Sequence, residues 1–265
     1  MLALKQYQQR CVDDISTYLK QVRESGDPDT TFYKLRKSTY QPFTGDPATP
    51  FVCIKVPTGG GKTLLAAHSV VQAFDQYLPE KDQCGLVLWL VPSDAILSQT
   101  LKQLRDRRHP YREVLDHTFD SRVIVMQKDE ALSIKPSDIS DNLCIVVTTL
   151  ASIRRENTEG LKVYSQNGAL MEHFRKLRST SYLLKEGTTV IQSLANVIRL
   201  HRPLVILDEG HNAQTELSIE VLKNLLPSCI LEYTATPDSR SNILIEVLAV
   251  ELKLEIGRAS CRERV

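Results

Sequence analysis

The stretch VPTGGGKT, residues 56–63, constrains the fold of this chain more than any other feature. The β-branched run FVCIKV leads into it and the apolar run LLAAHSVV follows it, so three glycines stand between an expected strand and an expected helix. A glycine turn at that point lets backbone N–H groups surround a phosphate at the N-terminus of a helix. Gly61, Lys62 and Thr63 match the end of the pattern GxxxxGK[ST]. Its first position is Val56 instead of glycine, yet the stretch predicts a phosphate site.

The side chains of this stretch have separate expected roles. Lys62 would reach the β- and γ-phosphates of ATP, and the Thr63 hydroxyl would hold Mg²⁺. Such a site needs a carboxylate at the end of a neighbouring strand, and VILDEGH supplies Asp208 for the metal and Glu209 to polarise a water. The loop expected to wrap the phosphates consists of Thr58, Gly59, Gly60 and Gly61.

Short apolar runs alternate with amphipathic stretches along most of the chain. Continuously apolar strands separated by helices favour an α/β fold, a parallel sheet with helices on both faces. The expected strands are 51–56, 85–92, 122–126, 143–148, 203–207 and 229–233, and the expected helices are 4–22, 64–77, 94–106 and 216–226.

The domain organisation follows from the segments between these elements. Residues 24–50 are rich in Pro, Gly, Asp and Thr and are expected to form a loop insert, so 1–50 is an N-terminal helix plus loop. A nucleotide-binding domain is expected over 51–254. Within it, residues 153–200 are polar and predict a mostly helical insertion.

The last eleven residues, EIGRASCRERV (255–265), differ from everything before them. They match the translation of one frame of a common short-read sequencing adapter over their whole length. We expect them to be an artefact, to be excluded from fold reasoning. The natural gene is then expected to continue beyond codon 254, with a disordered basic tail as the alternative.

Composition excludes several classes of protein. The net charge of +1 gives no global attraction to nucleic acid, so any such contact must come from local placement. The six cysteines form no CxxC pair, which favours reduced core cysteines in a cytoplasmic protein over a zinc site. No apolar run approaches the ~20 residues of a membrane span, so no membrane partner is expected.

Six motifs, in order, resemble those of superfamily 2 helicases and translocases, in which the first glycine of motif I is routinely absent. They are LKQYQ (4–8, the adenine-reading motif), VPTGGGKT (motif I), LWLVPSDAILSQ (88–99, motif Ia), VVTTL (146–150, motif Ib), DEGH (208–211, motif II) and TATP (234–237, motif III).

The resemblance implies a RecA-like P-loop NTPase domain and further site residues. Gln8 would offer its amide to the adenine edge with Tyr7 beside it, and His211 would sense the γ-phosphate. The residues implied to couple hydrolysis to strand movement are Thr234, Ala235 and Thr236. Those implied to contact nucleic acid are Pro92, Ser93, Thr148 and Thr149. Ser93 is also a plausible N-cap of the helix after it, which alone would explain a serine there.

Within the superfamily, the LKQYQ start, the insert before motif I and the surrounding PFVCIKVPTGGGKTLLAAH resemble the helicase-like subunit of type III restriction enzymes. DEGH departs from a strict DEAH box at Gly210. The resemblance implies double-stranded DNA and a modification methyltransferase subunit as partners. It also implies a second RecA-like domain that supplies arginine fingers.

Alternative functions stay open at this point. They are a stand-alone DNA-repair or RNA helicase of the same superfamily, a P-loop ATPase that moves proteins, and an interaction module with an inactive motor. The basic cluster Lys102, Arg105, Arg107, Arg108 and Arg112 fits either a solvated helix face or phosphate attraction. Trp89 and His68 are expected to pack in the interior.

Overall fold

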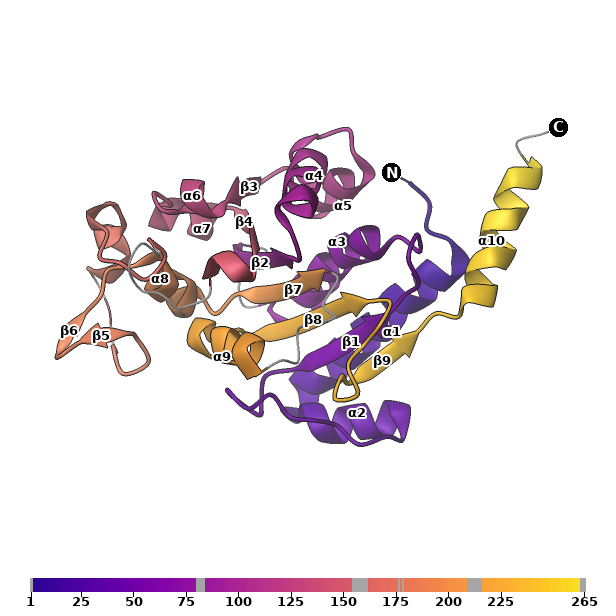
Figure 1. Ribbon diagram of the computed structural model, residues 1–265, viewed down its shortest axis with the longest axis horizontal. Coiled ribbons are helices and arrows are strands. Elements are labelled where there is room, and N and C mark those ends of the chain that lie inside the picture. Colours follow the sequence, from indigo (N-terminus) through magenta and orange to yellow (C-terminus); the bar gives the residue numbers. More distant parts are fainter. Residues whose placement is uncertain are drawn as a thin grey trace.

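The computed structural model describes residues 2–79, 84–153, 162–175, 177, 179–208 and 216–262, with a seven-stranded sheet at the centre (Figure 1). Every pairing in this sheet is parallel, and the strand order is β3-β4-β2-β7-β8-β1-β9. The strands are β1 (Phe51–Lys55), β2 (Gly85–Val91), β3 (Val123–Gln127), β4 (Leu143–Thr149), β7 (Leu204–Asp208), β8 (Cys229–Thr234) and β9 (Ile243–Glu246). This arrangement confirms the predicted parallel α/β sheet.

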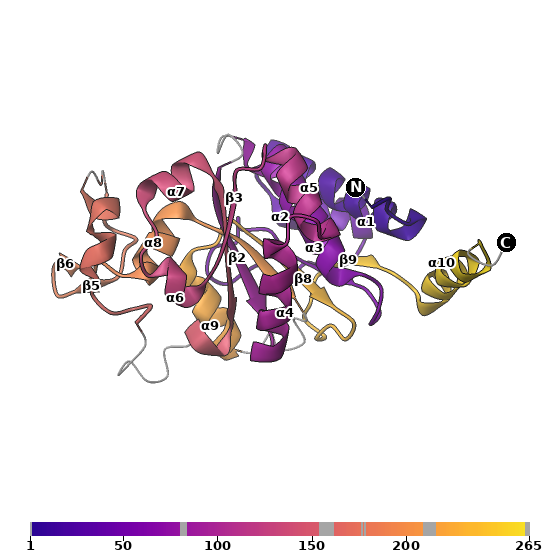
Figure 2. The same cartoon turned by 90° about the horizontal axis from the view of Figure 1, so that it is seen from above.

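Helices cover both faces of the sheet, as Figure 2 shows from above. One layer contains α1 (Gln6–Ser25), α2 (Pro28–Arg36), α3 (Lys62–Gln72) with a π-helical turn (Ala73–Tyr77), α4 (Asp94–Arg105) and α5 (Pro110–Thr118). The other contains α6 (Lys128–Ala131), α7 (Pro136–Asp141), α8 (Leu194–His201) and α9 (Glu216–Leu225). The last helix, α10 (Ala249–Arg262), lies beside the start of α1 at the edge of the molecule.

The core consists of two apolar clusters, one on each face of the sheet. Successive strand residues point to opposite faces. In β7, for example, Ile206 packs with the layer of α1 and α3, whereas Val205 and Leu207 pack with the layer of α8 and α9. Strands buried on both faces account for the continuously apolar runs in the sequence.

The predicted loop at 24–50 is wrong in part, because α2 lies within it. Asp27 caps this helix by accepting a hydrogen bond from the Thr30 N–H at 3.1 Å, and Pro28 occupies its first turn. Asp and Pro favour a helix start as strongly as a loop. The buried Phe32 then attaches α2 to the core.

The predicted mostly helical insertion at 153–200 is also wrong for the described residues. These residues form 3₁₀ turns (Ala151–Ile153 and Gly168–Phe174), a hairpin of β5 (Lys185–Glu186) and β6 (Thr189–Val190), and only one α-helix, α8. Gly187 has a φ of 60° in the hairpin turn, which favours the turn over a continuous helix.

Helix α10 runs without a break past residue 254 into the segment 255–265, which the sequence predicts to be an artefact. Within it, the Glu255 carboxylate accepts hydrogen bonds from the N–H groups of Gln6 and Tyr7 at 3.0 and 3.1 Å. The origin of residues 255–265 stays a prediction.

Five cysteines fall among the residues whose side chains the structure describes, and all five are buried and free. In the same residues no cluster of three or more His, Cys, Asp or Glu side chains could hold a metal ion. No helix of the described residues is long and apolar enough to cross a membrane.

Candidate nucleotide site

The predicted site residues gather at one edge of the sheet because parallel strands end together. The strand order places β7, β8 and β1 side by side, and their carboxyl ends lead to Asp208, Thr234 and the VPTGGGKT loop. Ligands of open α/β sheets bind in the crevice outside this edge.

The loop has the backbone shape that a phosphate cradle needs. Gly59 and Gly61 adopt φ values of 80° and 75°, a region that favours glycine. Val56 is fully buried, and its Cγ1 would lie only 2.5 Å from a Cβ added at Gly60. Val56 is not among the residues with positive φ, so glycine is not required at this first position.

The polar groups of the cradle converge with the carboxylate from β7. The Thr63 Oγ1 donates a hydrogen bond to Asp208 Oδ2 at 3.2 Å, although 145 positions separate the two residues. Lys62 begins α3 and is only 7 % exposed, and Asp208 is 5 % exposed. A hydroxyl and a carboxylate are hard oxygen ligands that suit Mg²⁺, which usually takes one or two protein carboxylates together with phosphates. These residues therefore fit a magnesium nucleotide.

The start of α1 packs directly on the loop. The Tyr7 hydroxyl donates to the Gly60 carbonyl at 3.0 Å, and Gln8 Nε2 would lie 2.7 Å from a Cβ at Gly61. Gln8 Oε1 accepts from the Lys5 N–H at 3.0 Å and so helps to cap α1. Burial, followed by the Glu255 carboxylate, raises the pKa of Tyr7 to about 12, so its hydroxyl remains a donor. A pocket of about 300 Å³ lies beside Tyr7, between α1 and α10.

The TATP segment touches the same loop. The Thr234 carbonyl accepts a hydrogen bond from the Val56 N–H at 2.9 Å, and its Oγ1 accepts from the Thr236 N–H at 3.1 Å. Thr234 is buried, whereas Ala235 is half-buried and Thr236 is exposed. The remaining predicted residues of motif II, Glu209 and His211, lie outside the described residues.

The predicted nucleic-acid residues differ in accessibility. Pro92 and Ser93 are exposed, and Ser93 caps α4 by accepting from the Ile96 N–H at 3.4 Å. Thr148 and Thr149 are buried, and their hydroxyls bond to Ser152 at 2.7 and 3.3 Å. A phosphate contact through these two hydroxyls would require that turn to open, so their role stays a prediction.

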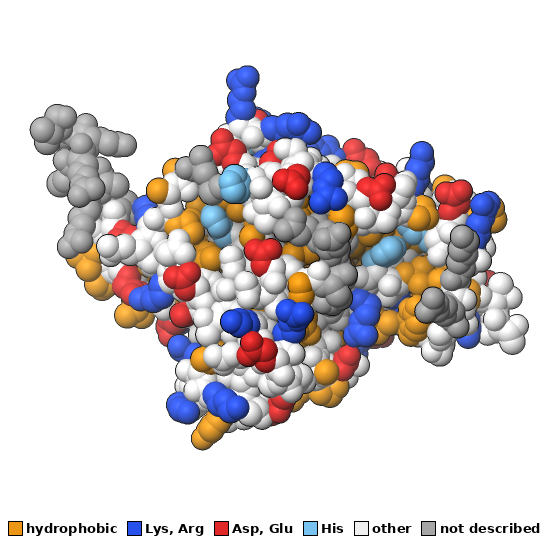
Figure 3. Space-filling view, turned by 180° about the vertical axis from the view of Figure 1, so that it is seen from behind, with side chains coloured by type: hydrophobic (Ala, Val, Ile, Leu, Met, Phe, Trp, Pro, Cys, Tyr) orange, Lys and Arg blue, Asp and Glu red, His pale blue; other side chains and the backbone are white. Residues whose placement is uncertain are grey.

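Of the basic cluster, Arg112 is structural. It is buried, pairs with Asp116 at 2.7 Å, and donates to the carbonyls of Leu104 and Val123 at 3.2 and 2.8 Å. Arg105 pairs with Glu130. On the face seen in Figure 3, basic and acidic side chains are interspersed among the coloured residues.

Of the two residues expected in the interior, Trp89 lies there and His68 is half-buried. Trp89 is fully buried in β2. The ring atom Nε2 of His68 is buried without a hydrogen-bond partner, and burial lowers the pKa of this histidine.

Sequence reasoning missed Glu232 and Ser241. Glu232 is fully buried in β8, and Ser241 donates to its carboxylate. A single acidic residue inside the apolar run CILEYT is the only signal, and it does not reveal the partner.

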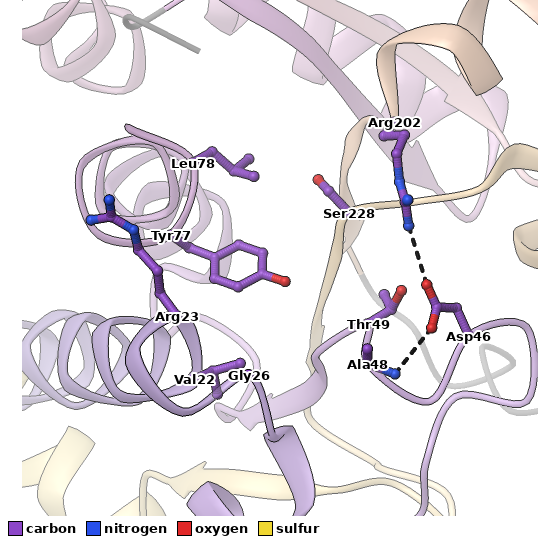
Figure 4. A pocket seen from close by; sticks show the side chains of 10 residues that line it. All are labelled: Val22, Arg23, Gly26, Asp46, Ala48, Thr49, Tyr77, Leu78, Arg202 and Ser228. Atoms are coloured by element: carbon purple, nitrogen blue, oxygen red, sulfur yellow. Dashed lines mark hydrogen bonds and ion pairs between the residues drawn. The ribbon is translucent and has the colours of Figure 1, made fainter. Parts of the chain in front are cut away.

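A larger pocket, of about 500 Å³, lies at the opposite edge of the sheet (Figure 4). Arg202 and Ser228 line it. Arg202 lies two residues before the start of β7, and Ser228 lies one residue before the start of β8. The Tyr77 ring points into this pocket, and Arg202 reaches Asp46 at 3.2 Å. Because it is at the amino ends of the strands, this pocket is no part of the nucleotide site.

A parallel sheet with this glycine loop and a facing carboxylate defines a RecA-like P-loop NTPase domain. The chain belongs to the family described as "Type III restriction enzyme, res subunit", whose model matches residues 1–239.

Three solved structures are similar to this chain at low identity. A nuclease-deletion mutant of the Type ISP restriction-modification enzyme LlaGI with a DNA substrate mimic is 14% identical, with a TM-score of 0.46, covering 99% of this chain and 21% of that one. The Sulfolobus solfataricus SWI2/SNF2 ATPase core with dsDNA is 16% identical, with a TM-score of 0.40, and the match covers 89% of this chain and 32% of that one. The Pyrococcus furiosus Hef helicase domain is 16% identical, with a TM-score of 0.37, and the match covers 78% of this chain and 33% of that one. This chain thus spans a third or less of each of those chains, and no curated protein matches it.

Proposed function

We propose that this chain is the first ATP-binding motor domain of an ATP-dependent DNA helicase or translocase, and that this domain belongs to the helicase-like subunit of a type III restriction enzyme. The observation that carries the proposal is the 3.2 Å contact between Thr63 and Asp208 beside the buried Lys62. In the proposed Mg·ATP site, Thr63 comes from the glycine loop and Asp208 from the end of β7, so two separate parts of the chain form it. Family membership supports the restriction role.

In this proposal each residue has one task. Lys62 binds the β- and γ-phosphates, while Thr63 and Asp208 hold Mg²⁺. The bound metal neutralises charge on the phosphates. The base lies beside Gln8, whose amide is close to Gly61 of the loop. Glu209 orients the attacking water and His211 senses the γ-phosphate.

The proposed partners are double-stranded DNA and a modification methyltransferase subunit, in the cytoplasm. Two of the solved structures similar to this chain are complexes, one with a DNA substrate mimic and one with double-stranded DNA. Full turnover is proposed to need arginine fingers from a second RecA-like domain, each contributing about 10³–10⁵ in rate. We therefore expect the 265-residue chain to bind Mg·ATP weakly and to hydrolyse it very slowly.

Binding of a fluorescent ATP analogue tests the site directly. Lys62→Ala should weaken binding about 100-fold, because a charge-assisted contact to phosphate contributes about 3 kcal/mol. Lys55→Ala is the matched control, because Lys55 pairs with Glu246 at 2.7 Å outside the loop. Equal affinities of the wild type and Lys62→Ala, or binding that persists after Mg²⁺ is chelated, would refute the proposed site.

A further inference from the structure

Glu232 is a carboxylate buried at the centre of the sheet. It is 0 % exposed and lies in β8, with Leu207 of β7 and Cys53 of β1 as its neighbours in register. Burying a carboxylate is costly, and an apolar residue of similar volume is often neutral or stabilising in such a place. A role in packing alone therefore does not explain this residue.

The contacts of Glu232 join the strand of the phosphate loop to the segment after TATP. Ser241 Oγ donates to its Oε2 and Oε1 at 3.1 and 3.4 Å. On the other side, burial and then the Glu232 carboxylate raise the pKa of the Cys53 thiol, which keeps that thiol protonated beside it. Cys53 precedes Val56, the first residue of the phosphate loop, by three positions.

One face of β8 holds both ends of the loop 235–241. Glu232 and Thr234 are two residues apart in a strand, so their side chains point to the same face. Thr234 Oγ1 accepts from the Thr236 N–H at 3.1 Å at the near end, and Glu232 binds Ser241 at the far end. The Thr234 carbonyl is also bonded to the Val56 N–H.

We propose that Glu232 is a positioning residue that transmits the state of the phosphate loop to the loop 235–241. The inference rests on the proposed ATP site. A shift of the phosphate loop on nucleotide binding moves β1 relative to β8 through the Val56–Thr234 and Cys53–Glu232 contacts. The hydrogen bond from Ser241 to Glu232 carries that shift to the far end of the loop.

Hydrogen exchange of the 265-residue chain, measured with and without an Mg·ATP analogue, tests this inference. In the wild type, the nucleotide should slow exchange of the amides of 235–241 about tenfold, a typical coupling between two sites. In Ser241→Ala and in Glu232→Ala that response should disappear. Nucleotide affinity should change by less than about threefold, because a loop that opens only rarely in both states adds little to the binding free energy.

Three further variants separate the explanations. Glu232→Gln keeps an acceptor for Ser241 and should retain most of the response, which a general packing defect would not predict. Ser228→Ala is the matched control. Ser228 directly precedes the other end of β8 and its hydroxyl donates to the Pro203 carbonyl, so this variant should respond to the nucleotide like the wild type. Lys62→Ala should weaken nucleotide binding itself about 100-fold.

The outcomes are distinguishable. If the wild type binds no nucleotide, the proposed function fails. If it binds and the loop does not respond, or if Ser241→Ala responds like the wild type, Glu232 has no transmitting role. If Glu232→Ala fails to fold, the comparison of Ser241→Ala with Ser228→Ala still decides whether the contact between Ser241 and Glu232 transmits the response.

Discussion

Gly61 shows how closely one residue is constrained at the phosphate loop. Its φ is 75°, and a Cβ there would lie 2.7 Å from Gln8 Nε2. Alanine would therefore meet both backbone strain, about 1–2 kcal/mol for a left-handed residue, and a clash with the Gln8 side chain. The shape of the loop and the position of Gln8 depend on the same missing side chain.

We expect Gly61→Ala to weaken binding of an Mg·ATP analogue by at least about tenfold, the equivalent of roughly 1.4 kcal/mol. Gly168→Ala is the matched control, because a Cβ there meets nothing within 4 Å. Fluorescence titration of both variants measures the difference. Unchanged affinity in Gly61→Ala would show that the loop does not bind phosphate in this form.

At the scale of elements, α2 illustrates where local chemistry is ambiguous. The run DPDTTFYKLR contains the residues of a turn, yet it forms a helix because Asp27 caps it and Phe32 reaches the core. For the polar segment 153–200 the prediction failed in the opposite way. Its periodicity suggested helices, but apart from α8 its described residues form turns and a short hairpin. Strands such as β2 and β4 were predictable because burial on both faces leaves a continuous apolar run.

The cap of α2 can be tested by Asp27→Ala. Loss of the hydrogen bond to the Thr30 N–H should lower the free energy of unfolding by about 1 kcal/mol. Asp29→Ala removes the same charge from the first turn, but Asp29 does not cap the helix. This variant should therefore lower the free energy of unfolding by less. Urea denaturation followed by circular dichroism compares the two, and a larger loss in Asp29→Ala would contradict the assignment of the cap.

At the scale of the whole molecule, buried thiols and phenols make stability depend on alkaline pH. Burial raises the pKa of Cys11 and Cys144 from 9.0 to about 12, and that of Tyr7 and Tyr40 from 10.0 to about 12. Above pH 9 to 10 the unfolded chain therefore loses these protons while the folded chain retains them. The unfolded state then binds fewer protons, so the free energy of unfolding falls as pH rises towards 12.

We accordingly expect the urea midpoint to fall between about pH 8 and about pH 11, with a reductant present throughout. Tyrosine absorbance followed at the same time should show that the buried phenols ionise together with unfolding. A midpoint that stays constant over this range would mean that these groups are not buried as the structure places them.

The residues of the candidate site also fall into two groups, those that the sequence predicted and those that only the structure revealed. Lys62, Thr63 and Asp208 were predictable because each belongs to a short pattern at the end of an apolar strand. The contacts of Tyr7 with Gly60 and of Glu232 with Ser241 were not, because neither partner has a spacing that marks the other. Val56 shows the intermediate case: the sequence marked it as a departure, and only its buried packing under Gly60 shows why it is compatible with the loop.

The sequence by itself determined the α/β class, most of the strands of the sheet and the residues of the phosphate loop, because these depend on local periodicity and on glycine chemistry. Only the tertiary structure decided the strand order that puts Asp208 beside Thr63, and the burial that pairs Arg112 with Asp116 and bonds the Thr148 and Thr149 hydroxyls to Ser152. The physical reason is that burial and hydrogen bonding between distant residues depend on the whole packed sheet. No local window of the chain contains that information.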